Sequence, residues 1–304
     1  MPAVYTPTMD RATVTATFSR RMRVRLPDGA EVDARIKGKR LKPVCGDTVT
    51  IEPLPDEHDW LITGVDERRN ELTRPNASGR IEVLAANVDY VCVVAAAAPK
   101  PDWFIVDRYL CAAELMSIGA AVVFNKVDLD GGPAAGELEV YRRIGYDVVP
   151  CSAVSGAGID ELATLLEGRR SIIVGQSGVG KSTIINRLIG AEIQPTAAIS
   201  HKTREGRHTT VSSTMIPLPA GGEIIDSPGV RDYAPALQSA AIASQGFREI
   251  RRAAQECRFT NCWHLREPGC AVKEGAETGE ISPRRYESYK RIVNLTRKLA
   301  DGRY

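Results

Sequence analysis

The chain has 304 residues, of which 43% are hydrophobic and 26% are charged. This composition excludes a disordered or fibrous protein, and the length favours two or three domains over a single core. The sequence has no apolar run of about eighteen residues, which excludes a membrane-spanning helix, and residues 1–11 lack the apolar stretch of a secretory signal. Seven cysteines, four of them isolated in or beside apolar runs, indicate a reducing, cytoplasmic setting.

Charge is distributed unevenly along the sequence. The net charge is +2 for the whole chain, but residues 81–245 sum to −5 and residues 246–304 to +5. Within the N-terminal part, residues 11–42 carry ten basic and three acidic side chains. An acidic middle between two basic ends is typical of a protein whose ends contact a polyanion, although a solvated charged surface would give the same pattern.

Residues 12–66 are predicted to form about five short strands. From Arg21 to Leu26, arginine and apolar side chains alternate, which gives one cationic and one apolar face. Pro27 to Gly29 is a turn, and further strands are predicted over 31–36, 48–52 and 60–65. This pattern favours an OB-fold barrel whose arginine face follows a phosphate backbone, with a barrel that is merely basic outside as the alternative.

After a linker predicted at residues 76–79, strands alternate with helices. The strands have continuous apolar runs, which are typical of a parallel sheet covered on both faces. The predicted strands are 88–97, 120–124, 148–152 and 171–174, and the predicted helices are 102–117, 159–166 and 183–189.

A phosphate-binding motif lies between a predicted strand and a predicted helix. The residues are Gly175, Gln176, Ser177, Gly178, Val179, Gly180, Lys181 and Ser182, followed by Thr183. They fit GxxxxGK[ST], in which backbone N–H groups surround the phosphates at the positive end of a helix. Lys181 is expected to reach the terminal phosphates and Ser182 to bind Mg²⁺.

Two short motifs that precede this loop predict guanine recognition. Asn125, Lys126, Val127 and Asp128 form an NKxD element directly after a strand. The Asp128 carboxylate can accept hydrogen bonds from N1 and the exocyclic amine of guanine, whereas adenine offers no such pair of donors. Asn125 would brace the loop and Lys126 would lie over the ring. Ser152 and Ala153, after the next strand, resemble the element whose backbone N–H meets guanine O6.

A DxxG motif follows the apolar pair Ile224 and Ile225. Asp226 is expected to hold the Mg²⁺ shell, the N–H of Gly229 to meet the γ-phosphate, and either Thr209 or Thr210 to supply a switch threonine to the metal. Each of these short motifs, taken alone, could be an ordinary surface loop or turn. Their order is unusual, because NKxD and Ser-Ala come before the phosphate loop. That order is the mark of a circularly permuted GTPase.

The C-terminal part contains four soft or borderline metal ligands within fourteen residues, namely Cys257, Cys262, His264 and Cys270. Three thiolates and an imidazole suit one closed tetrahedral Zn²⁺ site of structural type, with a metal-free cysteine cluster as the alternative. A helix is predicted from Pro283 to about residue 299, with Arg284 and Arg285 among its outward side chains.

The sequence therefore predicts an α/β multidomain protein with three parts. They are an N-terminal OB-fold β-barrel that binds RNA (1–75), a circularly permuted P-loop GTPase domain (81–245) and a C-terminal zinc-binding helical module (246–304). Taken together, these motifs resemble the ribosome small-subunit-dependent GTPase A family of bacteria, and the likeness covers nearly the whole chain.

The resemblance implies hydrolysis of GTP to GDP and phosphate, with Mg²⁺, stimulated by the small (30S) ribosomal subunit. It also implies a role in late maturation of that subunit, with barrel and zinc module contacting its rRNA. We expect a cytoplasmic monomer with no membrane contact.

The water-positioning group is left open by the sequence. Val230 follows Gly229, where many GTPases place a glutamine that orients the attacking water. We therefore expect slow intrinsic turnover, and His208 is the candidate for this role, with packing or RNA contact as its alternative.

Two other classes of protein fit parts of the sequence. One is an RNA-binding module with a vestigial nucleotide pocket, which the intact Lys181, Ser182, Asp226 and Asp128 disfavour. The other is a GTPase that regulates a protein or transports a metal, which the basic flanks disfavour.

Overall fold

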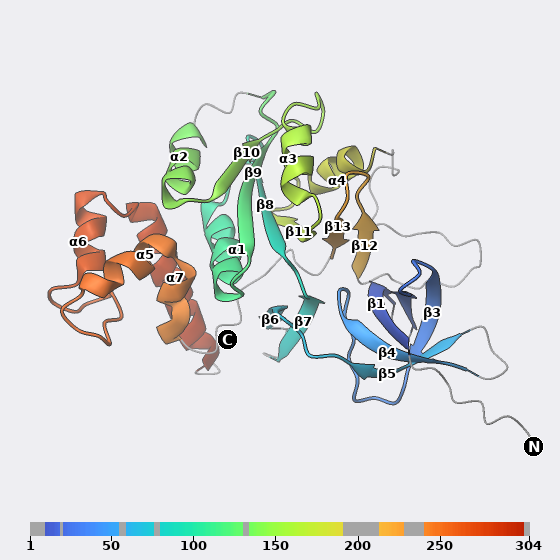
Figure 1. The fold of residues 1–304 in the computed structure, drawn as a ribbon. Helices are drawn as coiled ribbons and strands as arrows, with labels where there is room; N and C mark the ends of the chain where they lie inside the picture. The colour runs from blue at the N-terminus through green and yellow to red at the C-terminus, as the bar shows by residue number, and fades with distance from the viewer. Residues whose placement is uncertain are drawn as a thin grey trace, which may run out of the picture.

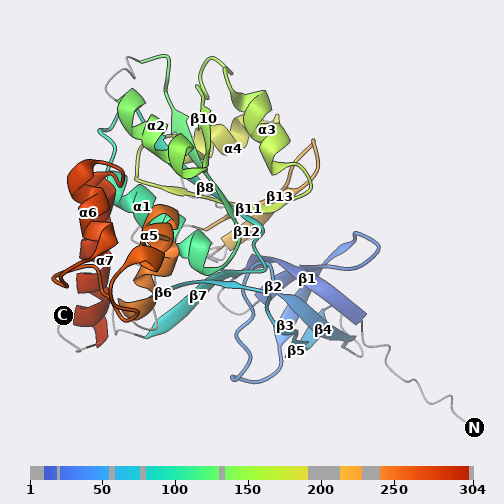
Figure 2. The ribbon, with the colours of Figure 1, turned by 60° about the vertical axis from the view of Figure 1, so that its left-hand side comes forward.

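The computed structural model describes residues 10–18, 21–54, 59–75, 80–129, 134–190, 213–227 and 240–300. An eleven-stranded sheet passes through two of the three parts of the molecule, in the order β10-β9-β8-β11-β13-β12-β1-β2-β3-β5-β4. Its first six strands form an α/β layer and its last five form a barrel (Figure 1). The helical C-terminal part lies beside the α/β layer, to the left of the barrel in both views (Figures 1 and 2).

The predicted N-terminal barrel is confirmed. It consists of β1 (Asp10–Thr17), β2 (Arg21–Arg25), β3 (Glu31–Ile36), β4 (Thr48–Pro53) and β5 (Trp60–Val65). An additional pairing between β1 and β4 closes it. Fully buried aliphatic side chains such as Val14, Val24 and Ile62 fill the interior, because alternate residues of each strand point inward.

The arginines on the outer face of β2 lie beside acidic side chains of the same chain. Arg23 pairs with Asp33 at 3.2 Å, and Arg25 pairs with Glu31 at 3.6 Å and with Glu223. These guanidinium groups are held by carboxylates of the chain itself. Period-two patterning gives the face on which a side chain lies, but not its partner.

A small two-stranded sheet connects the barrel to the α/β layer. β6 (Glu71–Pro75) pairs antiparallel with β7 (Ile81–Ala86), and the predicted linker at residues 76–79 falls outside the described residues. Leu72 and Leu84 are buried in the same core as the strands of the α/β layer. The two strands therefore pack with the middle part of the molecule.

The α/β layer has five parallel strands and one antiparallel strand. Its strands are β8 (Tyr90–Ala96), β9 (Gly119–Asn125), β10 (Asp147–Pro150), β11 (Arg170–Gly175), β12 (Ser213–Pro217) and β13 (Glu223–Asp226). Only β12 runs antiparallel to its neighbour β13. The parallel sheet predicted from continuous apolar runs is confirmed.

Helices cover both faces of this sheet, as the apolar strands require. Val91 and Val93 of β8 face one core with α1 (Trp103–Leu115) and α2 (Ala135–Ile144). Cys92 and Val94 face the other core with α3 (Ile159–Leu166) and α4 (Lys181–Ile189). Asp102 caps α1 by accepting from the backbone N–H groups of Phe104 and Ile105.

The C-terminal module packs against α1. It contains η3 (Ala240–Gly246), α5 (Arg248–Ala253), η4 (Ala254–Glu256), α6 (Ala271–Thr278) and α7 (Pro283–Ala300). Cys111 of α1 is part of its core. No helix within the described ranges is long and apolar enough to cross a membrane.

The outward placement predicted for Arg285 is wrong. Its side chain is fully buried and bonds to Asp107 of α1 at 2.6 Å and Glu249 of α5 at 2.5 Å. A cationic residue on an amphipathic helix is normally solvent-exposed, and here the two carboxylates stabilise it inside, together with the ring of Phe247 at 4.9 Å.

Candidate functional site

The described nucleotide motifs gather at one edge of the sheet. Asn125 ends β9, Gly175 ends β11 and Asp226 ends β13, and Ser152 follows β10 closely. Because these strands are parallel, their carboxyl ends share one edge, where open α/β sheets bind ligands. Permutation of the chain has left this spatial arrangement intact.

Asn125 links three of the loops. Its Nδ2 donates to the carbonyl of Val179 at 2.8 Å, and its Oδ1 accepts from the N–H of Ala153 at 3.0 Å. The side chain is nearly fully buried. Asn125 therefore braces the phosphate loop and the Ser-Ala loop against the strand that carries it.

Lys126 and Asp128 lie next to this brace. Lys126 has a left-handed backbone with φ of +63°, and its Nζ donates to the carbonyls of Ala98 at 2.6 Å and Gly178 at 2.8 Å. Its alkyl chain thus crosses between two loops. Asp128 is exposed, which leaves its carboxylate open to solvent and to a base.

The phosphate loop depends on glycines at two close approaches. A Cβ on Gly175, whose φ is +139°, would lie 2.1 Å from the carbonyl oxygen of Val94, and one on Gly180 would lie 2.4 Å from Nδ2 of Asn125. Gly180 is the N-cap of α4, so the positive end of that helix faces the loop. Lys181 Nζ donates to the carbonyls of Gly175 and Gln176, each at 2.8 Å.

The residues expected to bind Mg²⁺ divide into two sets. Ser182 is exposed at the start of α4, and Asp226 is half-buried at the end of β13, the strand beside β11. Oxygen ligands of this kind suit Mg²⁺. The other two candidates, Thr209 and Thr210, lie outside the described residues, as do His208 and Gly229.

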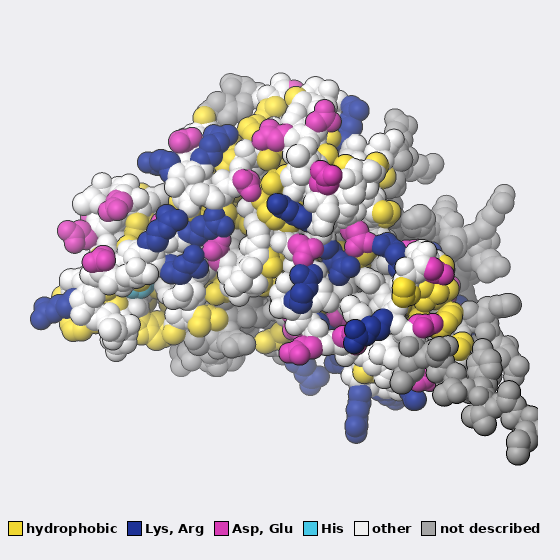
Figure 3. Space-filling view, in the orientation of Figure 1, with side chains coloured by type: hydrophobic (Ala, Val, Ile, Leu, Met, Phe, Trp, Pro, Cys, Tyr) yellow, Lys and Arg dark blue, Asp and Glu magenta, His cyan; other side chains and the backbone are white. Residues whose placement is uncertain are grey.

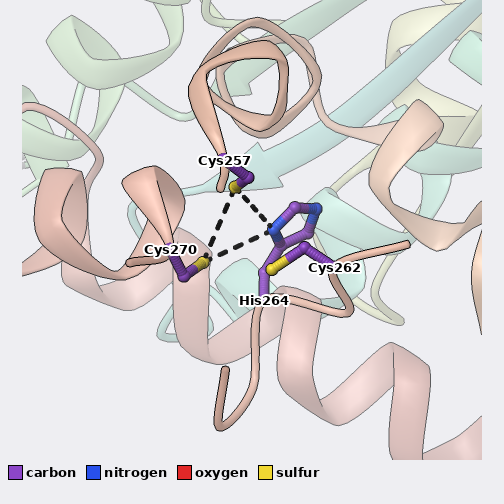
Figure 4. A group of neighbouring side chains, drawn as sticks. All are labelled: Cys257, Cys262, His264 and Cys270. Carbon is purple, nitrogen blue, oxygen red and sulfur yellow. Dashed lines mark hydrogen bonds between the residues drawn. The ribbon is translucent and has the colours of Figure 1, made fainter. Parts of the chain in front are cut away.

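The second site is the cluster of Cys257, Cys262, His264 and Cys270, whose ligand atoms all lie within 4.8 Å of one another (Figure 4). Nδ1 of His264 is 3.5 Å from Sγ of both Cys257 and Cys270, and these two sulfurs are 3.9 Å apart. A tetrahedral zinc ion with ordinary bond lengths would hold S and N about 3.5 Å apart and two S atoms about 3.8 Å apart. The cluster thus has the dimensions and the donor set of a zinc site.

Residues that the sequence did not single out hold the metal loop in shape. The Glu267 carboxylate accepts from the backbone N–H groups of Trp263, Leu265 and Arg266 at 3.1, 2.9 and 3.0 Å. Burial alone would raise the pKa of Glu267, but these N–H donors outweigh it and lower the pKa to about 2. In the sequence Glu267 lies between the metal ligands His264 and Cys270, and this position is the feature that could have indicated its role.

Two tyrosines of helix α7 form hydrogen bonds to the backbone of the same loop. Tyr286 donates to the carbonyl of His264 at 2.7 Å, and Tyr289 donates to the carbonyl of Trp263 at 2.8 Å. Burial lowers the pKa of His264 and raises the pKa of Cys262 to about 12. A cation would therefore displace protons from the thiols and find a neutral imidazole.

A phosphate loop, an NKxD element and a DxxG strand at the carboxyl edge of one parallel sheet, in this chain order, define a circularly permuted P-loop GTPase. The family model described as RsgA GTPase matches residues 65–235. The chain belongs to the RsgA GTPase family, and its members use Mg²⁺ with the nucleotide.

Individual relatives agree with this membership. A protein of Actinobacillus succinogenes named small ribosomal subunit biogenesis GTPase RsgA is 40% identical over 238 residues, covering 77% of this chain and 68% of its own. A protein of the same name from Azotobacter vinelandii is 41% identical over 230 residues, covering 74% and 67%. The crystal structure of YjeQ from Thermotoga maritima aligns with a TM-score of 0.75 and 30% identity, covering 95% of this chain and 98% of that one. YloQ, titled a circularly permuted GTPase, shares the fold, with a TM-score of 0.73, 24% identity and 98% of each chain covered.

Proposed function

We propose that this GTPase hydrolyses GTP on the small ribosomal subunit and assists its late maturation, with the barrel and the metal module contacting rRNA. The observation that carries the proposal is the undamaged, permuted nucleotide site in a chain about 40% identical to relatives named for biogenesis of that subunit. A vestigial pocket would not be expected to keep Asn125 bonded to both neighbouring loops.

In this proposal each site residue has a role in binding GTP. Asp128 accepts from guanine, Asn125 braces its loop and Lys126 lies over the ring. The N–H groups of residues 152–153 meet O6 of the base. Residues 175–183 surround the phosphates, with Lys181 moving from its loop carbonyls to the terminal phosphates. Mg²⁺ supplies charge neutralisation and is held by Ser182, Asp226 and one of Thr209 and Thr210.

We assign one structural Zn²⁺ to the cysteine cluster. All four ligand atoms come from the chain, so no position is open for catalysis. Replacing Cys257 with alanine should abolish zinc binding and loosen the module. A Cys257→Ala protein that keeps its full zinc content would show that the site is misassigned.

The RNA contact of the barrel is assigned to the loop between β3 and β4. Lys37, Lys39, Arg40 and Lys42 are all exposed, and none of them forms an ion pair with a carboxylate of the described residues. Figure 3 shows Lys and Arg side chains projecting below the barrel, on the side away from the α/β layer. Exposed cations of this kind release counterions from a phosphate backbone.

Sedimentation with purified small subunits at rising salt tests this assignment. The double variant Lys39→Ala/Arg40→Ala should bind about tenfold more weakly and show a shallower salt dependence, because two phosphate contacts are lost. The matched control removes Arg142 and Arg143, two exposed arginines of α2. Equal binding by both double variants would contradict the assignment.

We further propose that His208 positions the attacking water, because Val230 cannot. His208→Ala should then reduce the turnover stimulated by small subunits while leaving nucleotide affinity intact. Unchanged stimulated turnover would refute this role.

We also infer a cytoplasmic monomer whose functional units are residues 1–75, 81–245 and 246–304. Limited proteolysis can test the boundaries of these units.

A further inference from the structure

The barrel is joined directly to the hairpin that carries Asp226. β12 and β13 form this hairpin, and the outer side of β12 pairs with β1 of the barrel. Ala16 pairs with Thr214, and Thr214 pairs with Asp226. Since neighbouring strands lie about 4.8 Å apart, the barrel backbone comes within about 10 Å of Asp226.

A charged cluster fixes the other end of the hairpin. Glu223, the first residue of β13, pairs with Arg25 at the end of β2 and accepts from Arg170 of β11 at 3.2 Å. Arg170 also donates to the carbonyl of Gly46 in the barrel at 3.0 Å. Side-chain exposure is 18% for Glu223, 27% for Arg25 and 20% for Arg170. Ion pairs this shielded from solvent are stronger than ordinary surface pairs.

The position of Glu223 along β13 determines the position of Asp226. The two residues are three apart on one short strand, which spans about 10 Å and cannot bend much within that length. The Glu223 N–H also donates to the carbonyl of Arg169 at 2.9 Å, which sets the register of β13 against β11. At the other end, Ser213 donates to Ser227 at 3.0 Å across the hairpin.

We propose that Arg25 is a positioning residue for GTP hydrolysis: through Glu223 this barrel side chain fixes the hairpin that presents Asp226 to the magnesium ion. The barrel then contributes to the geometry of the nucleotide site, in addition to any contact it makes with RNA. This inference rests on the Mg²⁺ role proposed above for Asp226.

The chain offers a matched pair of variants. Arg25→Ala removes the pairs with both Glu223 and Glu31, whereas Glu31→Gln removes only the pair inside the barrel. Arg25→Lys keeps the charge and serves as the conservative rescue. Two readouts are independent of turnover: the Mg²⁺ concentration at which a fluorescent GDP analogue is retained, and amide hydrogen exchange in residues 213–226.

Arg25→Ala should raise the Mg²⁺ requirement and the exchange rate of the hairpin by about tenfold, the order expected within one ion-pair network. Glu31→Gln should stay close to wild type, and Arg25→Lys should recover most of the loss. Equal behaviour of Arg25→Ala and Glu31→Gln would overturn the proposal. So would faster exchange of the hairpin with an unchanged Mg²⁺ requirement, since Asp226 would then not depend on the bridge.

Asp226→Asn separates this inference from the proposed function. If Asp226→Asn leaves the Mg²⁺ requirement unchanged, the role of Asp226 fails and the positioning role of Arg25 fails with it. If Asp226→Asn raises the requirement and Arg25→Ala does not, the positioning role alone is overturned.

Discussion

At the scale of single residues, the nucleotide site depends on contacts that leave no room for additional atoms. Gly180 has φ of +94°, and its α-carbon faces the amide of Asn125, which connects three loops. A side chain here would strain the backbone and displace that amide. A single added methyl group at Gly180 should therefore disturb the hydrogen bonds by which Asn125 joins the phosphate loop to the Ser-Ala loop.

Gly180→Ala should therefore weaken guanine nucleotide binding by at least about tenfold, because strain at such a position is of the order of 1–3 kcal/mol before the lost hydrogen bonds are counted. Gly168→Ala is the control, since Gly168 has a similar left-handed backbone with φ of +67° and no atom within 4 Å of an added Cβ. Titration with a fluorescent GDP analogue measures both. Equal affinities in the two variants would show that the close approach of Gly180 to Asn125 does not support nucleotide binding.

Glu267 supports the metal site by fixing the backbone of the loop that carries its ligands. Glu267→Gln loses the charge that accepts three backbone N–H groups, so zinc affinity should fall about ten- to a hundredfold, as for other residues that support metal ligands. The lowered pKa means that its stabilisation is present above the ordinary carboxyl pKa and lost only as pH falls toward 2. The factor should therefore be the same at pH 8 and pH 6 in competition with a chelator. A factor that shrinks over that range would show that another group is responsible.

At the scale of elements, α7 docks on the α/β layer through a buried ionic cluster. Arg284 and Arg285 converge on Asp107 of α1, which is fully buried and also accepts from Tyr141 of α2 at 2.7 Å. This arrangement anchors the metal module to the helices beside the NKxD strand. The module is thereby attached to a part of the domain that lies outside the DxxG hairpin.

Arg285→Ala should lower the free energy of unfolding by about 3–5 kcal/mol, because it removes both ion pairs of a buried guanidinium and leaves Glu249 without this partner and Asp107 with only Arg284 and Tyr141. Arg297→Ala is the control on the same helix: this exposed guanidinium lies over Trp263 at 4.5 Å from the ring centroid and should contribute less than about 1 kcal/mol. Denaturant unfolding compares the two. A loss for Arg285→Ala no larger than that for Arg297→Ala would contradict a buried role.

Elements with a strong local pattern could be predicted from the sequence, and those set by tertiary contacts could not. The apolar strands β8, β9 and β11 and the phosphate loop were predicted close to their observed bounds. β12 was missed because its five residues carry no alternation of their own and are held by strands on both sides. The inward side chain of Arg285 and the Arg25–Glu223 bridge join segments far apart in the chain, and no local pattern indicates such partners.

At the scale of the whole molecule, one sheet joins the barrel to the GTPase layer, and one buried ionic cluster joins the metal module to it. A particle that contacts the barrel and the module at once would therefore contact two parts that are both attached to the layer that carries the nucleotide site. That arrangement suits an enzyme whose turnover depends on what it is bound to. We therefore expect turnover to depend on this binding and to require a guanine base.

The most direct test is phosphate release from GTP and from ATP, each with and without purified small ribosomal subunits. We predict slow GTP turnover by the protein alone, stimulation by subunits of about tenfold or more, and no comparable effect with ATP. GTP turnover that subunits leave unchanged, or ATP hydrolysed as fast as GTP, would contradict this prediction.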